Sequence, residues 1–294
     1  MLICMLFSRI LVSSHSKIWN CKFINLGAQI SQGGAIYMKG DYNLEVLACG
    51  FINCTVTTNG GAIFASGGNF NAKMVCFYKS YIKQSTNNVF GNAIYINSIT
   101  NAEYLGANLC GISFETASDS TLYFYSFKTE ISNSNCSECS GNGGPSGVGL
   151  DKISNQCIIR FFCIYGGISS HAMCFWTMPS LSINNILFIN AQFRYQMWWL
   201  SSSNIKVDNC YIYKVTYGTF LTGGVLSFTN SFCDIVFSTT GLLKTSFILP
   251  VQVNVFYGDC QQPFYHNTVS LVLHQKNILS FHLFIFGLLN YNSW

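Results

Sequence analysis

A short glycine motif repeats near the N-terminus of this chain and constrains its fold more than any other feature. The motif Gly-Gly-Ala-Ile plus an aromatic residue stands at residues 33–37 and 60–64, and a near copy with Asn92 as its second residue stands at 91–95. The copies start 27 and 31 residues apart. Because a motif that recurs at nearly one period marks equivalent structural units, repeats must determine the architecture.

A second element accompanies the first two copies of the glycine motif. Cys-Lys-Phe-Ile-Asn at 21–25 returns 28 residues later as Cys-Gly-Phe-Ile-Asn at 49–53. Between the motifs, short runs such as 44–47 alternate apolar and polar residues, which is the period of a strand. Turn residues such as those at 58–61 separate these runs. The sequence therefore predicts stacked strands joined by tight turns.

The second half of the chain repeats less clearly. Four runs with an apolar-polar-apolar pattern begin at Leu181, Ile205, Leu226 and Val251, with separations of 24, 21 and 25 residues. Tetratricopeptide and ankyrin repeats need helices that no sustained periodicity here supports, and propeller blades need about 40 to 50 residues. We therefore expect an all-β fold, a right-handed parallel β-helix of about ten coils, in which inward side chains stack like on like and asparagines stack at bends.

The composition suits extended strands and polar turns. Charged residues make up 9% of the 294 residues, against roughly 25% in an ordinary soluble domain, while hydrophobic residues make up 50%. Only four prolines interrupt ladder hydrogen bonds. The 15 Lys and Arg residues are scattered singly, although the net charge is +4. No basic run of the kind that nucleic-acid binding needs is present, so we expect no nucleic-acid partner.

Fourteen cysteines allow two interpretations. They suit an oxidising compartment, in which disulfides form and persist. Alternatively, Cys21, Cys49 and Cys76 occupy equivalent repeat positions, where a small apolar side chain stacks on itself inside a coil as a free thiol. The sequence leaves both interpretations open.

The solenoid is expected to form one domain over residues 17–275. Residues 1–16 are either a secretory signal segment or a truncated first coil, because Arg9 interrupts their apolar run. The small, polar, glycine-rich stretch near 130–150 is expected to protrude as a loop. Residues 276–294 form a hydrophobic C-terminal segment whose apolar run is shorter than the roughly 20 residues of a spanning helix, so its membrane attachment stays open.

No candidate site in the sequence has the specificity of an established catalytic or metal motif. Cys136 and Cys139 have the spacing of half a zinc site. Cys157 and Cys163 are available as the second pair, but five residues rather than two separate them, and His171 is a lone histidine. Asp234 and Asp259 each lie eight positions after a strand start, so they would be stacked neighbours like the carboxylates of a polysaccharide hydrolase. We expect solvated turn residues there instead. The prediction is therefore no catalytic residue, no metal site and no cofactor.

An aromatic cluster near residue 196 has two interpretations. Phe193, Tyr195, Trp198 and Trp199 match either an aromatic platform for a sugar or a cluster in the repeat core. The sequence favours the core cluster, and hence packing rather than binding.

The glycine tetrads at 33–36 and 60–63 carry a resemblance to a known family. The chain resembles the polymorphic outer membrane proteins, right-handed β-helices of chlamydial surfaces that are also abundant as predicted surface proteins in some protists. That family alternates Gly-Gly-Ala-Ile with Phe-x-x-Asn, and here the second tetrad at 51–54 has its Asn one place early. The resemblance covers residues 20–95 and is of the protist type, because we expect no autotransporter barrel. It implies an adhesin or surface antigen.

Together these observations predict a non-catalytic secreted or cell-surface protein used in adhesion, binding or antigenic display. The expected partner is a host-cell surface or an extracellular glycan, the expected location is extracellular or at the cell surface, and we expect a monomer. Two alternatives stay open: a pectate-lyase-like enzyme that degrades a polysaccharide, and a truncated, non-functional copy from an expanded family. Carboxylate geometry separates the enzyme from the binding protein, because several acids that converge in one groove with a Lys or Arg favour cleavage.

Overall fold

A computed structural model of the chain describes most residues between 4 and 233 and two short segments beyond them. The described residues are 4–6, 8–27, 30, 32–83, 90–98, 101–104, 120–126, 128–137, 139, 141–153, 156–176, 178, 181–201, 204–233, 251–254 and 268–271. They form strands, turns and bends, and this part of the chain contains no helix long and apolar enough to cross a membrane. The expected C-terminal segment 276–294 lies outside the described residues.

Most strands belong to three parallel sheets, which we name A, B and C. Sheet A contains β1 (Cys4–Leu6), β4 (Cys21–Ile24), β7 (Gly50–Ile52) and β11 (Cys76–Tyr78). Sheet B contains β2 (Ile10–Val12), β5 (Ile36–Lys39), β9 (Ile63–Ser66), β13 (Ile94–Ser98), β15 (Leu122–Ser126), β17 (Gly141–Asp151), β19 (Ile168–Trp176), β21 (Gln192–Leu200) and β23 (Thr216–Thr222).

Sheet C runs beside sheet B through the whole stack. It contains β3 (Ser16–Trp19), β6 (Leu44–Leu47), β10 (Asn69–Lys73), β14 (Asn101–Tyr104), β16 (Lys128–Ser137), β18 (Gln156–Tyr165), β20 (Leu181–Ile189), β22 (Asn204–Tyr213), β24 (Val225–Thr229) and the short β25 (Phe232–Cys233). Two further pairs are β8 (Thr55–Val56) with β12 (Tyr81–Ile82), and β26 (Val251–Asn254) with β27 (Thr268–Leu271).

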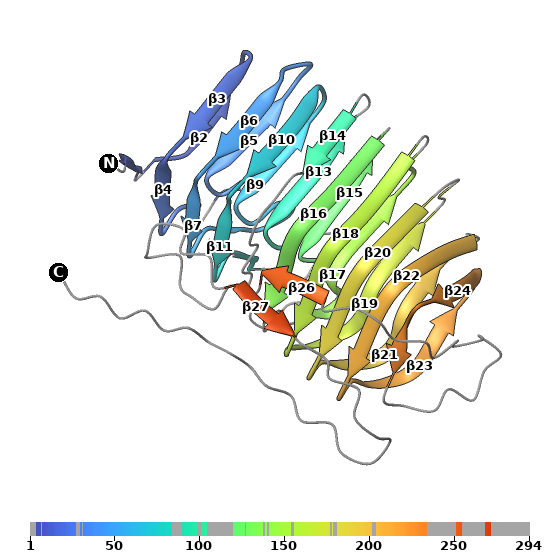
Figure 1. Cartoon of the computed structure of the whole chain (residues 1–294). Coiled ribbons are helices and arrows are strands. Elements are labelled where there is room, and N and C mark those ends of the chain that lie inside the picture. Colours follow the sequence, from blue (N-terminus) through green and yellow to red (C-terminus); the bar gives the residue numbers. More distant parts are fainter. Residues whose placement is uncertain are drawn as a thin grey trace.

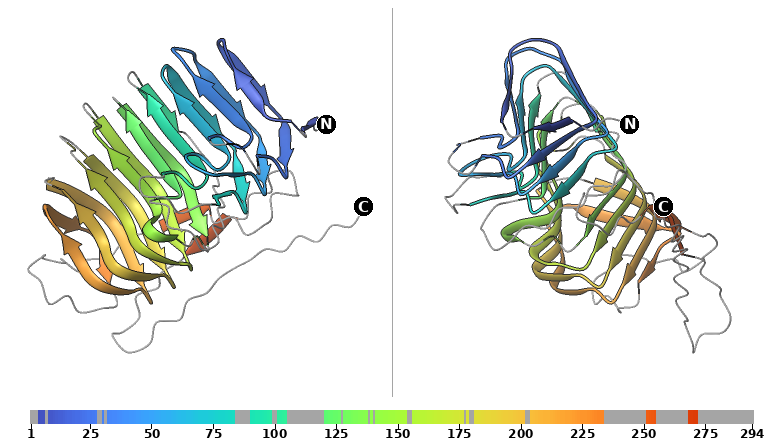
Figure 2. Two further views of the ribbon diagram at one scale, coloured as in Figure 1. Left: turned by 180° about the vertical axis from the view of Figure 1, so that it is seen from behind. Right: turned by 90° about the vertical axis from the view of Figure 1, so that its left-hand side faces the viewer.

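Successive coils stack along one axis, and each coil places one strand in sheet B and the next strand in sheet C (Figure 1). Figure 2 shows the same coils following one another from the N-terminal to the C-terminal end of the stack. The described residues make nine such coils, from β2–β3 to β23–β24, against about ten expected. The predicted parallel β-helix is confirmed, while its right-handed sense stays a prediction. Strands β1 and β2, within residues 1–16, continue sheets A and B.

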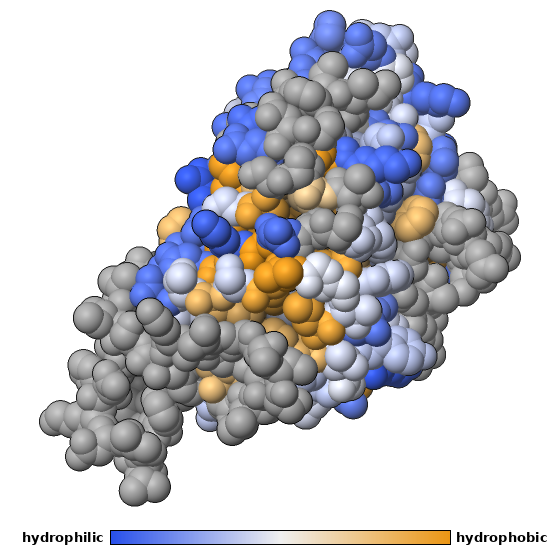
Figure 3. All heavy atoms as spheres, turned by 90° about the vertical axis from the view of Figure 1, so that its right-hand side faces the viewer, coloured by the Kyte–Doolittle hydropathy of each residue, from blue (hydrophilic) through white to orange (hydrophobic). Residues whose placement is uncertain are grey.

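Alternation along each strand separates the core from the surface. In β6, Leu44 and Val46 are buried, whereas Glu45 is partly exposed. The inward side chains form one continuous hydrophobic cluster from the first coils to the last, and its removal from water is the main term that favours folding. On the face seen from the side of the last coils, hydrophobic residues gather in the middle of the view, with hydrophilic residues around them (Figure 3).

The glycine tetrads occupy one register position in neighbouring coils, as their spacing predicts. Ile36 pairs with Ile63, Ile63 pairs with Ile94, and all three side chains are fully buried. The aromatic residues that follow the tetrads stack on the outside of sheet B. Tyr37 and Phe64 have ring centroids 5.3 Å apart, and the next pair, Phe64 and Tyr95, lies at 5.1 Å.

The first glycine of each tetrad is required by the backbone. Gly33, Gly60 and Gly91 have φ values of 59°, 68° and 73°, a region that L side chains disfavour. A Cβ atom on Gly60 would also overlap the carbonyl oxygen of Ile63. The tetrad therefore begins with glycine because each coil turns sharply there.

Pairs of residues with positive φ, five positions apart, make two further bends in many coils. The pairs are Asn20 and Asn25, Ala48 and Asn53, Met74 and Lys79, Phe161 and Gly166, Asn185 and Asn190, and Asn209 and Lys214. Asparagine recurs here because its short polar side chain tolerates the left-handed region. Asn53 Nδ2 donates a hydrogen bond to Oδ1 of Asn25 at 2.7 Å, which confirms the predicted stacking of asparagines at bends.

Three of the four runs predicted in the second half are equivalent strands of sheet C. Ile183 of β20 pairs with Val207 of β22, and Val207 pairs with Phe228 of β24. The fourth prediction is wrong, because the run at Val251 forms β26, which pairs antiparallel with β27 and lies against β16 and β18. Alternation alone cannot distinguish these outcomes, since it indicates a strand but not its partner or direction.

The stretch near 130–150 is not a protruding loop but forms most of β16 and β17. Its small residues fit the interior, where Ser134 and Cys136 are fully buried. Pro145 lies at a register shift between β17 and β19, which is a place where a sheet tolerates proline. Small polar residues signal a loop by composition, but the narrow interior of a coil accepts them as well.

Exchange of glycine and alanine should have opposite effects at two bends. Gly60→Ala should destabilise the protein by about 2 kcal/mol or more, because it adds a Cβ atom where φ is positive and a carbonyl oxygen lies too close. Ala48→Gly should leave stability unchanged or raise it by up to about 1 kcal/mol, because Ala48 has a φ of 49° and glycine relieves that strain. Urea unfolding measures both, and a larger loss for Ala48→Gly than for Gly60→Ala would contradict the role given to these bends.

Candidate functional site

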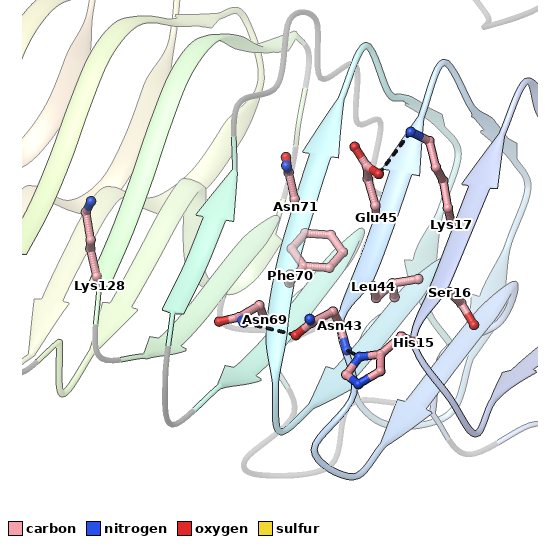
Figure 4. Close-up of a pocket in the computed structure, with 10 residues that line it drawn as sticks. All are labelled: His15, Ser16, Lys17, Asn43, Leu44, Glu45, Asn69, Phe70, Asn71 and Lys128. Carbon is pink, nitrogen blue, oxygen red and sulfur yellow. Dashed lines mark hydrogen bonds and ion pairs between the residues drawn. The ribbon is translucent and has the colours of Figure 1, made fainter.

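The outer face of sheet C carries a groove of about 720 Å³ in the N-terminal half of the stack (Figure 4). Its lining comes from β3, β6, β10 and β16 and from the residues just before β3 and β6. The lining residues are His15, Ser16, Lys17, Asn43, Leu44, Glu45, Asn69, Phe70, Asn71 and Lys128. The volume lies within the range of small-molecule and sugar-sized sites, and most of these side chains are polar.

One column of this groove consists of residues at the same position in successive coils. The Asn43 backbone N–H donates a hydrogen bond to Nδ1 of His15 at 2.9 Å, and Asn69 Nδ2 donates one to Oδ1 of Asn43 at 2.9 Å. By register, Asn101 of β14 and Lys128 of β16 continue the column. The hydrogen bonds hold the amides in line along the axis of the stack, at about 4.8 Å per coil.

A second column runs parallel to the first, two residues further along each strand. In order, its register positions are Lys17, Glu45, Asn71, Glu103 and Glu130. Lys17 Nζ lies 3.1 Å from Glu45 Oε2, and a dashed line joins the two side chains in Figure 4. Glu130 forms an ion pair with Arg160. These pairs neutralise one carboxylate that lines the groove, Glu45, and one beside it, Glu130.

Lys128 stands apart at the end of the groove nearest β16 (Figure 4). Its ammonium group pairs with no carboxylate in the part of the chain that the structure describes. The groove therefore offers amide donors and acceptors in its middle and a cation at one end, which are groups that bind hydroxyls and carboxylates.

Two carboxylates outside the groove are also held by neighbours. Asp208 accepts hydrogen bonds from Thr229 Oγ1 at 2.6 Å and from Asn230 Nδ2 at 2.9 Å. Asp151 accepts one from the Tyr123 hydroxyl at 3.1 Å. These contacts account for both carboxylates as structural groups of the coil surface.

The structure describes only some of the candidate residues that the sequence suggested. Asp234 and Asp259 lie outside the described residues. The alignment on which their predicted proximity rested is wrong, because Leu226 lies in β24 of sheet C whereas Val251 begins β26, which pairs antiparallel with β27. Cys136 and Cys139 are both buried thiols. Among the described residues, no group of three or more His, Cys, Asp or Glu side chains is placed to hold a metal ion.

The cysteine column predicted from the repeats is correct for two members and wrong for the third. Cys21 and Cys49 are neighbours in adjacent coils, since Lys22 pairs with Gly50. Cys76 instead pairs with Gly50, one position out of line, and it is disulfide-bonded. A slip of one residue moves a side chain to the other face of a strand, so Cys76 does not belong to the inner column.

The buried thiols act as small donors at bends. Cys49 Sγ donates to the Leu47 carbonyl at 3.1 Å, and Cys54 Sγ donates to the Ile52 carbonyl at 3.7 Å. Burial raises the pKa of Cys49 and of Cys54 to about 12. Thiols with such pKa values stay protonated and are poor nucleophiles, so these two cysteines are structural.

The aromatic cluster near residue 196 divides between core and surface. Trp198 and Phe193 are buried, as the core interpretation predicts. Tyr195 and Trp199 are 60% and 37% exposed, as the platform interpretation requires. Each interpretation therefore holds for two of the four residues.

The groove on sheet C was missed by sequence reasoning. Asn43 and Asn69 belong to no motif, and each directly precedes or begins a short strand in an asparagine-rich chain. The signal that finds them is their shared distance from the next bend, because Asn43 lies five residues before Ala48 and Asn69 lies five before Met74.

Comparison with known proteins finds no relative of this chain. No protein-family model, no curated protein and no solved structure matches the chain.

Stability should fall as the pH rises from about 9 towards 12. The thiol pKa values of Cys49 and Cys54 are about 12 in the folded protein against an ordinary 9.0, so the unfolded chain loses these protons first. The contribution of the two thiols to the free energy of unfolding is complete below pH 9. Above pH 9 it declines by about 1.4 kcal/mol per pH unit for each thiol.

Serine gives the matched control for this pH dependence. At another bend Ser231 Oγ donates to the Thr229 carbonyl at 2.7 Å, so a hydroxyl can do what the thiol does. The double variant Cys49→Ser, Cys54→Ser should keep its donors and lose less stability between pH 8 and pH 10 in urea unfolding. Equal losses in the variant and the wild type would show that other groups cause the effect.

Proposed function

We propose that this protein is a non-catalytic β-helix that binds an extended glycan along the groove of sheet C. The observation that carries the proposal is the column of His15, Asn43 and Asn69, whose hydrogen bonds align polar side chains from successive coils. A linear chain of sugars presents hydroxyls at regular intervals, and a groove that repeats at about 4.8 Å per coil offers partners at regular intervals. Lys128, at one end, suits a sugar that carries a carboxylate or another anionic group.

Pairing of the nearby carboxylates favours binding over cleavage. Glycoside hydrolysis needs one carboxyl group as acid and another as base or nucleophile. Glu45, which lines the groove, is engaged by Lys17, and Glu130, which lies beside it, is engaged by Arg160. Both carboxyl groups therefore already have a cationic partner, which favours a groove that offers contacts for a glycan.

The biological setting of the proposal is adhesion or antigenic display outside the cell. Its support is the resemblance of the tetrads at 33–36 and 60–63 to the polymorphic outer membrane proteins, whose members are adhesins and surface antigens. A low content of charged residues fits a surface that binds through amides and hydroxyls. We propose that a monomer at the cell surface or in the extracellular medium binds glycans of a host-cell surface in this way.

A second candidate function rests on one observation. Glu103 and Glu130 occupy adjacent register positions of sheet C, next to the groove, and Arg160 accompanies them. Acids beside a basic residue on one face of a sheet are what we expect of a pectate-lyase-like enzyme, so polysaccharide cleavage is the alternative.

Binding is tested with a panel of soluble neutral and uronate-containing polysaccharides by affinity electrophoresis. Wild-type protein should be retarded by at least one of them, and Asn69→Ala and Lys128→Ala should each weaken the interaction about tenfold, the effect of one lost hydrogen bond to a charged or polar group. The matched control is Lys39→Ala, which removes an exposed lysine from sheet B and should change nothing. The proposal would be contradicted if no polysaccharide retarded the wild-type protein, or if both groove variants were retarded as strongly as the wild type.

Cleavage is tested by the release of reducing or unsaturated ends from the same polysaccharides. We expect no release by wild-type protein. If release occurs and Glu130→Gln abolishes it while binding persists, the enzyme is the correct function and the non-catalytic proposal is wrong.

A further inference from the structure

A row of aromatic side chains lies on the outer face of sheet B, in the coils that contain β19 and β21. We name Tyr195, His171, Trp199 and Trp176 the aromatic strip. His171 lies between the rings of Tyr195 and Trp199, with centroid distances of 6.1 and 5.1 Å. Trp176 meets Trp199 edge to face at 5.5 Å. The four rings thus form one connected cluster across two coils, in which His171 is buried.

Register shifts at one place in neighbouring strands create this surface. The pairing of β19 with β21 shifts between Ser169 and His171, and that of β21 with β23 shifts between Phe193 and Gln196. Such bulges re-aim side chains and are common beside functional sites. Because of the shift, consecutive residues of β21 face outward before the alternation resumes with buried Trp198.

A glycine in the next coil accommodates the bulge. A Cβ atom on Gly218 would lie 2.8 Å from the carbonyl oxygens of both Arg194 and Tyr195. The neighbouring coil therefore has glycine where the bulged backbone comes closest. The outward orientation of Tyr195 is thus supported by two strands.

Exposure and polar neighbours distinguish the strip from ordinary core packing. Tyr195 and Trp199 are 60% and 37% exposed. Contact between these rings and water is unfavourable, and a bound apolar surface would remove it. Beneath them, His171 is only 6% exposed, and its Nδ1 atom has no hydrogen-bond partner. Gln196, which is partly exposed and hydrogen-bonded to His171, adds an amide at the same place.

We propose that the aromatic strip is a second glycan-binding site, which takes a pyranose ring against Tyr195 and Trp199. A pyranose has a face of C–H groups that packs on an aromatic ring and a rim of hydroxyls that needs hydrogen-bond partners, here from the partly exposed amide of Gln196. A fatty acyl chain would leave this amide without a partner. The proposal does not rest on the groove of sheet C.

The test is a titration of short cello-, manno- and xylo-oligosaccharides, followed by tryptophan fluorescence and calorimetry. Wild-type protein should bind at least one of them, and Tyr195→Ala and Trp199→Ala should each weaken that binding about tenfold. Trp19→Ala is the matched control, because Trp19 is 64% exposed at the other end of the stack and should not affect binding. Asn69→Ala, in the groove of sheet C, should not affect it either, which separates the two sites.

Three results would overturn the proposal. The first is that no oligosaccharide binds, and the second is that both strip variants bind like the wild type. The third is that wild-type protein self-associates in sedimentation and Tyr195→Ala abolishes this without any effect on sugars, in which case the strip is a protein interface. Because Trp199 is partly buried, Tyr195→Ala decides the outcome if Trp199→Ala fails to fold.

Discussion

Stacking of equal side chains in register between adjacent coils is the interaction on which the rest of this structure depends. Phe23, Phe51 and Phe77 stack at centroid distances of 4.9 and 4.8 Å, with interplanar angles of 3° and 10°. Parallel pairing of the same strands satisfies the backbone along the same line. Stacking requires every coil to bend at the same places, and paired residues with positive φ provide those bends. Each coil is therefore stabilised chiefly by its two neighbours.

The register that builds the core also builds the surface. Outward positions stack as faithfully as inward ones, so Asn43 and Asn69 form a polar groove on sheet C. Sheet B carries aromatic residues instead, and bulges near Tyr195 and Gln196 bring them to the surface. With only 9% charged residues, the protein offers amides, hydroxyls and rings rather than dense charge, which suits the recognition of sugars.

The parts of the fold that repeat in the sequence could be predicted, and the parts that occur once could not. The tetrads at 33–36 and 60–63 predicted the register of sheet B because the same backbone turn demands the same glycine in each coil. Pro145 indicated a loop, since composition does not reveal that a bulge will accommodate it. The sequence favoured the core for the whole aromatic cluster, which is correct for Trp198 and wrong for Tyr195 and Trp199, because composition does not reveal a bulge that resets the alternation. The site on sheet C follows from register, which no single segment encodes.

Ring-to-ring nuclear Overhauser effects between phenylalanines test the central claim of in-register coils most directly. In a sample labelled so that only phenylalanine rings give signals in nuclear magnetic resonance, Phe23 should show cross-peaks to Phe51, 28 residues away. Phe51 should show cross-peaks to Phe77 as well. Substitution of Phe51 by leucine should remove both sets and identify them. Absence of these cross-peaks in the folded wild-type protein would contradict the stacked register, and with it both proposed binding sites.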